Sequence, residues 1–137
     1  MSNLIFVDTS AWVAVFVEGD GCHGTAVREM ERILDEGKTL LTTDYVLDET
    51  VTRIRYEGGH DLAVDVGERL QASRIARLVE VGREERDEAL RIFKKCGDQE
   101  FSFTDCTSFA TMKRFGLSEA FTFDSDFRKA GFSVLPG

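Results

Sequence analysis

The chain has 137 residues, of which 42% are hydrophobic and 31% charged, a composition typical of a globular domain with a core of its own. No apolar run is long enough to cross a bilayer and no basic segment precedes the first one, so we expect one domain spanning residues 1–137 in the cytoplasm. The formal net charge of −8 argues against a general polyanion-binding protein, although bound divalent cations would offset part of it. Three cysteines without a CxxC pair and two histidines without zinc-ligand spacing argue against a structural zinc site.

The first part of the chain alternates strand-like and helix-like segments. Residues 4–7 (Leu-Ile-Phe-Val) form an apolar run typical of a buried strand, and residues 10–17 then favour a short helix. Apolar residues at helical spacing over 26–34 predict a second helix, for which Gly37 is a suitable residue just beyond the end. Residues 39–42 predict the next strand.

The rest of the chain continues this alternation. In chain order the pattern predicts two helices over 46–54 and 62–70, a strand over 75–81, two helices over 89–96 and 102–115, and two strands over 120–123 and 132–135. Helices that alternate with strands indicate an α/β protein with a mostly parallel sheet.

Four acidic residues stand out by their positions in this pattern. Asp8 follows the first strand, Glu49 borders the apolar stripe of a helix, Asp105 opens the last long helix, and Asp124 follows the strand over 120–123. Because the carboxyl ends of parallel strands meet at one edge of a sheet, we expect these carboxylates to gather there. Carboxylate oxygens are ligands that Mg²⁺ and Mn²⁺ prefer, so the sequence suggests a metal site suited to phosphodiester cleavage.

Asp8 and Glu49 each have an ordinary structural role open to them as well. Asp8 could cap the first helix, a role that Ser10 could fill equally well. Glu49 could pair with Arg53 one helical turn away. Gathered carboxylates, in contrast, repel one another by roughly 4 kcal/mol per pair at about 4 Å and an effective dielectric near 20, so either their pKa values rise or a cation binds.

The two later acids also leave alternatives open. Ser102-Phe-Thr-Asp105 has the form of a capping box, in which Asp105 reaches back to a backbone amide, and Thr104 could be the cap instead. Asp124 could simply form a tight turn, and Asp126 is an alternative to it as the fourth acid.

Four segments resemble the motifs of the PIN domain family and follow the same order along the chain: Val-Asp8-Thr-Ser10, Thr-Thr-Asp-Tyr-Val-Leu-Asp-Glu49-Thr, Phe-Ser-Phe-Thr104-Asp105-Cys and Ala-Phe-Thr-Phe-Asp124-Ser-Asp-Phe. The short single-domain form is similar to VapC-type toxins of prokaryotic toxin–antitoxin pairs. The resemblance implies a five-stranded parallel sheet between helices and an endoribonuclease that depends on Mg²⁺ or Mn²⁺. It also implies a homodimer and an antitoxin protein that occupies the cleft.

The resemblance further implies a role for each acidic residue. Asp8, Glu49, Asp105 and Asp124 would form an acidic quartet, supported by the hydroxyl groups of Thr9, Ser10 or Thr104. We expect Asp8 and Asp105 to hold the cation, Glu49 to position or deprotonate the attacking water, and Asp124 to complete the ligand set. The main alternative is a non-catalytic module that uses the PIN fold to bind RNA or a protein.

An acidic nuclease needs local cations for its RNA substrate, and the sequence offers two pairs of them. Arg53 and Arg55 follow Glu49 on one helix, while Lys113 and Arg114 lie along the helix from Asp105, and both pairs could equally be solvated surface residues. Most aromatic residues are expected in the core. Trp12 and Phe16, four residues apart, are expected to pack onto the sheet, with a dimer surface as the alternative; base stacking by Trp12 or Tyr45 is a further possibility.

Overall fold

The structure is a computed structural model that describes residues 3–137, and its centre is a sheet of five parallel strands. The strands lie in the order β3-β2-β1-β4-β5, so both β2 and β4 flank the first strand. This arrangement confirms the expected α/β fold with a parallel sheet. The strands are β1 (Leu4–Val7), β2 (Thr39–Thr43), β3 (Arg77–Val79), β4 (Glu119–Phe121) and β5 (Ser133–Leu135).

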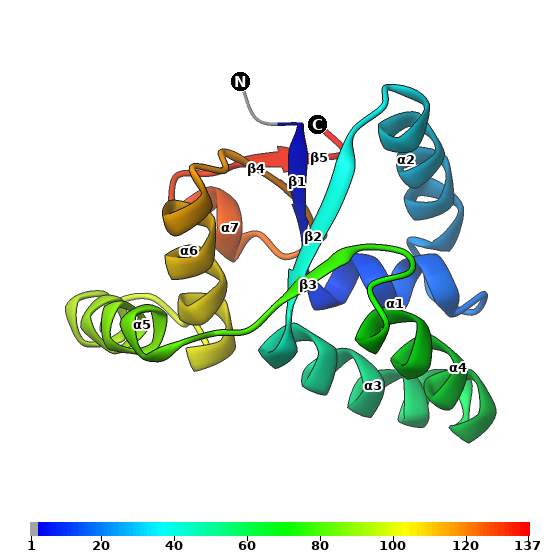
Figure 1. Ribbon diagram of the computed structural model, residues 1–137, viewed down its shortest axis with the longest axis horizontal. Coiled ribbons are helices and arrows are strands. Elements are labelled where there is room, and N and C mark those ends of the chain that lie inside the picture. Colours follow the sequence, from blue (N-terminus) through cyan, green and yellow to red (C-terminus); the bar gives the residue numbers. More distant parts are fainter. Residues whose placement is uncertain (1–2) are drawn as a thin grey trace.

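Helices cover both sides of the sheet. In Figure 1, α5, α6 and α7 gather on one side of the strands, and α1, α2, α3 and α4 on the other. None of the helices within residues 3–137 combines the length and the apolar character needed to cross a membrane. The helices are α1 (Thr9–Phe16), α2 (His23–Asp35), α3 (Asp44–Gly58), α4 (His60–Gln71), α5 (Arg83–Lys95), α6 (Phe103–Phe115) and α7 (Asp126–Lys129).

The central strand β1 is buried on both faces, as parallel strands between two helical layers must be. The side chains of Ile5, Phe6 and Val7 have no solvent exposure. Trp12 is equally buried, and its indole nitrogen donates a hydrogen bond to Thr42 Oγ1 at 3.3 Å. The prediction that Trp12 packs against the sheet is therefore confirmed, and a buried indole cannot stack on a nucleobase.

Helix starts and ends follow the capping residues of the sequence, with one correction. Thr43 caps α3 by accepting a hydrogen bond from the amide of Val46, and Gly116 ends α6 in the left-handed region at φ +67°. The candidate cap Ser10 is wrong for α1, because the N-cap residue is Asp8, whose carboxylate accepts a 3.4 Å contact from the Ser10 amide. The hydroxyl of Ser10 is used elsewhere in the site.

Four segments differ from the sequence prediction. The helix expected over 89–96 begins six residues earlier, because α5 runs from Arg83 to Lys95. The strand expected over 75–81 pairs only along Arg77–Val79, because β3 is an edge strand with a single neighbour. The strand expected over 120–123 ends at Phe121. Beyond it, the amide of Thr122 donates to Leu135 O, that of Phe123 to Ser10 Oγ, and that of Asp124 to Thr122 Oγ1. The four-residue helix α7 replaces part of an expected turn and is too short to show helical periodicity in sequence.

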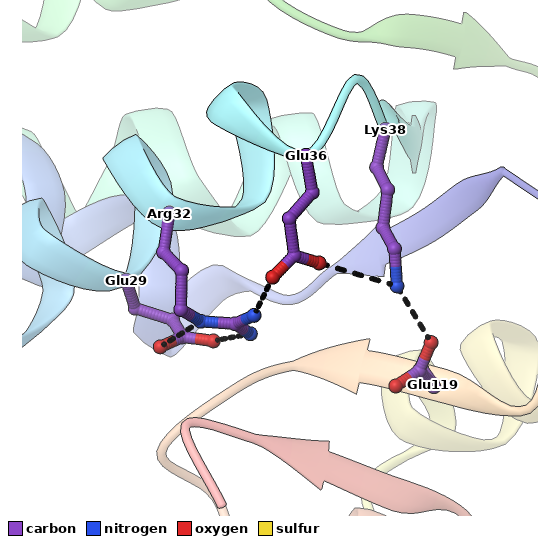
Figure 2. Close-up of polar contacts among 5 residues, drawn as sticks. All are labelled: Glu29, Arg32, Glu36, Lys38 and Glu119. Carbon is purple, nitrogen blue, oxygen red and sulfur yellow. Dashed lines mark hydrogen bonds and ion pairs between the residues drawn. The ribbon is translucent and has the colours of Figure 1, made fainter.

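An ion-pair network holds α2 against the amino-terminal edge of the sheet (Figure 2). Arg32 pairs with both Glu29 and Glu36, and Lys38 continues the chain of contacts to Glu119, the first residue of β4, at 3.4 Å. Since most of these side chains are partly exposed, each pair contributes little to stability. The network lies at the end of the strands opposite to the acidic residues that follow β1 and β4.

Candidate metal and active site

The candidate acids lie at the carboxyl edge of the two central strands. Asp8 follows β1 directly, and Asp124 follows β4 after Thr122 and Phe123. Because β1 and β4 are neighbours in the sheet, their carboxyl ends deliver these two acids to one place. The first turn of α6 supplies Asp105 from the side of the sheet that α5 and α7 share (Figure 1).

Three aspartates form the centre of this site. Asp105, Asp124 and Asp126 each offer a carboxylate oxygen, and these oxygens lie within 4.8 Å of one another. A local turn brings the last two together, because Asp124 Oδ1 accepts a hydrogen bond from the amide of Asp126 at 2.9 Å. Asp124 and Asp126 therefore do not compete for one position, and the structure includes both of them in the acid cluster.

Asp8 lies against this cluster and is held by hydroxyl groups. Its Oδ2 atom accepts hydrogen bonds from Thr122 Oγ1 at 2.9 Å and from Ser10 Oγ at 3.0 Å. The Ser10 hydroxyl also accepts a bond from the amide of Phe123 at 2.9 Å, which ties α1 to the segment after β4. Ser10 and Thr122 together fix the orientation of the Asp8 carboxylate.

Burial and mutual repulsion raise the pKa values of two of these acids. Desolvation raises the pKa of Asp8 to about 6, although the hydroxyl donors Thr122 and Ser10 oppose the shift. Desolvation also raises the pKa of Asp105 to about 7, and the nearby carboxylates of Asp124, Asp8 and Asp126 add to it. The charged forms of Asp8 and Asp105 are thus disfavoured unless positive charge is supplied.

Asp105 closes a capping box and also belongs to the acid cluster. Ser102 and Asp105 form a capping box, with the Asp105 amide donating to Ser102 Oγ at 2.9 Å and the Ser102 amide donating to Asp105 Oδ2 at 3.1 Å. The cap is therefore Ser102, and the alternative Thr104 is wrong for that role. The capping contact fixes the direction of the carboxylate and leaves its other oxygen for the cluster.

Glu49 reaches the site indirectly. Its carboxylate accepts a 2.7 Å hydrogen bond from Thr9 Oγ1, and Thr9 is the residue after Asp8. The expected surface pair with Arg53 is wrong, because Arg53 bonds to Glu57 instead. Glu49 does not belong to the group of oxygens within 4.8 Å, so it lies at the border of the site and is oriented toward it by Thr9.

This donor set fits a hard divalent cation. Mg²⁺ and Mn²⁺ bind carboxylate oxygens and keep several water molecules, so a few oxygens at one open edge suffice. Neither cysteine nor histidine belongs to the cluster, which disfavours zinc. Asp8, Asp105, Asp124 and Asp126 are the residues that would hold the cation, and their repulsion in its absence is the reason why one would bind.

Sequence reasoning missed one residue of the site and left the status of another open. Thr122 orients Asp8 and also accepts a hydrogen bond from the Asp124 amide at 2.9 Å, so one hydroxyl serves both acids. The available signal was a single hydroxyl residue inside the apolar run Ala-Phe-Thr-Phe that precedes Asp124. The sequence left Asp126 as an alternative to Asp124, because the spacing of the two residues does not reveal the turn that brings both of them into the cluster.

An acid cluster at the carboxyl edge of a five-stranded parallel sheet defines the class of protein as an α/β domain with a candidate metal site. The sequence pattern of the PIN domain family matches residues 5–133, so the chain belongs to the PIN domain family. The 23S rRNA-specific endonuclease VapC20 of Mycobacterium tuberculosis is 36% identical over 129 residues, which make up 94% of this chain and 95% of that protein.

Solved structures agree with this assignment. The crystal structure of Mycobacterium tuberculosis VapC20, described as a sarcin-ricin loop cleaving toxin, has a TM-score of 0.84 and 37% identity, covering 93% of this chain and 95% of that one. VapBC2 from Rickettsia felis, bound to a fragment of its promoter DNA, has a TM-score of 0.69 at 10% identity, with 96% of each chain covered. FitAcB from Neisseria gonorrhoeae has a TM-score of 0.70 at 17% identity, with 95% of each chain covered. The last two show the fold alone.

Proposed function

We propose that this protein is an endoribonuclease that depends on Mg²⁺ or Mn²⁺ and acts as the toxin of a type II toxin–antitoxin pair. The observation that carries the proposal is the cluster of Asp105, Asp124 and Asp126, with Asp8 beside it, at the carboxyl edge of the sheet. Similarity to VapC20 along nearly the whole chain supports ribonuclease chemistry at this cluster. A bound divalent cation would supply an activated water near neutral pH and neutralise charge on the phosphate.

Each residue of the site has a role in this reaction. Asp8 and Asp105 would hold the cation in their ionised forms, and Asp124 and Asp126 would complete the acidic shell. Thr122 and Ser10 hold the Asp8 carboxylate in one orientation through their hydroxyl donors. Glu49, held by Thr9, positions the attacking water or accepts its proton.

The substrate we propose is a loop of ribosomal RNA. VapC20 is a 23S rRNA-specific endonuclease and is described as cleaving the sarcin-ricin loop. At 36% identity with matched length, the same class of substrate is the simplest expectation for this chain. With such a substrate, we expect the protein to act in the cytoplasm, where ribosomes are found.

A cognate antitoxin protein is the second partner that we propose. The structural relative VapBC2 is named as a complex bound to promoter DNA, which supports a toxin–antitoxin setting for the fold. The antitoxin would cover the acid cluster and so block access of RNA. The family resemblance also implies a homodimer. The molecular mass of the purified protein in solution would test this expectation.

Cleavage of ribosomal RNA with and without metal tests the proposed function. The wild-type protein should cut 23S rRNA when Mg²⁺ or Mn²⁺ is present, EDTA should abolish the cleavage, and Asp8→Asn should lose it. Asp61→Asn is the control, since Asp61 likewise lies at the start of a helix, in the first turn of α4, but is fully exposed. Cleavage that persists in EDTA, or in Asp8→Asn, would contradict a metal-dependent reaction at this site. A folded wild-type protein that cuts no RNA with either metal would leave a protein that only binds RNA or a partner.

A further inference from the structure

A cavity of about 680 Å³ lies between α5, α6 and the segment from α7 to β5, beside the acid cluster rather than over it. Its floor is aromatic. Phe101 and Phe109 pack edge to face with their ring centroids 5.1 Å apart, and Phe132 packs on Phe109 at 5.6 Å. Phe101 and Phe109 are nearly buried, whereas Phe132 is half-buried, so Phe132 is the ring of this floor that a flat base can contact.

The rim of the cavity is positively charged in a protein with a net charge of −8. Four cationic side chains line it against two acidic ones, Glu88 and Asp98. Arg91 bonds to Glu88 at 2.6 Å, and Lys113 lies 3.5 Å from the same carboxylate. Lys95 forms no ion pair within residues 3–137, so its charge is available to a ligand.

The cavity adjoins the candidate active site through two elements that both share. Phe109 lies one helical turn after Asp105 on α6. Lys129, at the end of α7, lines the cavity, and its ammonium group is 3.9 Å from the carboxylate of Asp126. A polynucleotide whose scissile phosphate lies at the acid cluster would therefore reach the cavity with a neighbouring nucleotide.

We propose that this cavity is a nucleotide subsite for the RNA substrate, outside the position of cleavage. An unpaired base lies on the phenylalanine floor, and the adjoining phosphates contact Lys95 and Lys113. Stacking on aromatic side chains combined with cation–phosphate contacts is the usual way in which single-stranded RNA is held. The inference rests on the proposed function and adds that the substrate must present an unpaired base next to the cut.

Two neighbouring lysines on α5 provide a matched test. Lys95→Gln removes a charge at the rim, while Lys94→Gln removes the same charge from an exposed residue that does not line the cavity. Both variants are compared with the wild-type protein on a long RNA with an unpaired loop and on a short RNA that ends beside the cut. Phe132→Leu, which keeps an apolar side chain but removes the ring, tests the floor, and thermal unfolding of each variant checks that it is folded.

For Lys95→Gln we expect a higher KM for the long RNA, an unchanged kcat, and a slope of log KM against log salt that is smaller by about 0.7, the value for one phosphate contact on a single strand. Phe132→Leu should raise the KM for the long RNA by roughly 5- to 150-fold, the range for loss of one stacked base. The short RNA should be cut equally by all of these variants, and Lys94→Gln should behave as wild type on both substrates.

A wild-type KM for the long RNA in both Lys95→Gln and Phe132→Leu would overturn the subsite while leaving the nuclease intact. Variants that instead lose affinity for the antitoxin, with RNA cleavage unchanged, would show that the cavity docks a protein. If the wild-type protein cuts no RNA, the proposed function fails on its own. Fluorescence anisotropy of a labelled single-stranded RNA with the same variants then decides whether the cavity binds RNA.

Discussion

Replacing Asp105 with asparagine should stabilise the metal-free protein at alkaline pH. Burial and three neighbouring acids raise the pKa of Asp105 from 3.8 to about 7, so the folded protein holds this proton more strongly than the unfolded chain does. Three pKa units correspond to roughly 4 kcal/mol of penalty for the folded state at pH 8. Asparagine removes the charge but keeps a carbonyl oxygen that can still accept from the Ser102 amide, at a cost of about 1 kcal/mol for the weaker cap.

The pH dependence follows from the sign of this shift. Because the folded pKa lies above the unfolded one, wild-type stability falls as the pH rises from about 4 to about 7 and is flat above that range. The Asp105→Asn variant lacks this loss. Its advantage should therefore be about 2–3 kcal/mol at pH 8, equivalent to a melting temperature higher by roughly 5–10 °C, and should shrink toward zero or reverse near pH 4.

Thermal and urea unfolding in EDTA at pH 4.5, 6 and 8 would measure this advantage, with Asp61→Asn as the exposed control. A variant that is less stable than wild type by the same amount at every pH would refute the reasoning. That result would mean that Asp105 acts as a helix cap only, and that its carboxylate does not experience the other acids.

Three further predictions concern the metal and its ligands. Millimolar Mg²⁺ should raise the melting temperature of the wild type, because a cation at a hundred times its Kd stabilises the folded state by about 2.7 kcal/mol. Asp124→Asn should lose most of that gain. A wild type whose melting temperature does not change with Mg²⁺ would contradict the site. Calorimetric metal affinity should weaken roughly tenfold from pH 8 to pH 6, since protons compete for Asp105 at a pKa of about 7, and a pH-independent affinity would contradict this. Thr122→Val should move the acid limb of the activity–pH profile to higher pH, because the Thr122 hydroxyl lowers the pKa of Asp8. Thr122→Ser keeps the hydroxyl and should leave the profile unchanged. If Thr122→Val has the same profile as the wild type, Thr122 has a packing role only.

Much of the fold is visible in the sequence because its signals are local. The apolar run of β1 and the helical spacing of α3 and α6 each depend on a few neighbouring residues, and Ser102 and Gly116 mark the two ends of α6. The extent of β3 and β4 is different. Those strands end where partner strands or side chains from other elements stop supplying hydrogen bonds, and that information is not local.

The same distinction applies to the site. Asp8, Asp105 and Asp124 could be predicted because their positions relative to strands and helices place them at one edge of the sheet. Whether Asp8 or Ser10 caps α1 could not be decided, because both have an oxygen at a suitable position, and the outcome depends on Thr122, which lies 114 residues away from Asp8. The inclusion of Asp126 depends on a turn closed by the Asp124 side chain.

The distribution of charge explains how an acidic protein can act on an anionic substrate. Several of its acids are paired with cations locally, as Glu29 and Glu36 are with Arg32 in the network at the far edge of the sheet. Within residues 3–137, the acids of the candidate site form no ion pair apart from the 3.9 Å contact of Lys129 with Asp126, so protons or a cation would relieve their repulsion. A bound divalent cation would offset part of the charge of these acids, while the charge of the cationic side chains that line the neighbouring cavity does not depend on the metal. Under the proposed function, metal binding and RNA binding would be coupled through charge, and we expect the metal-free protein to bind RNA poorly as well as to be inactive.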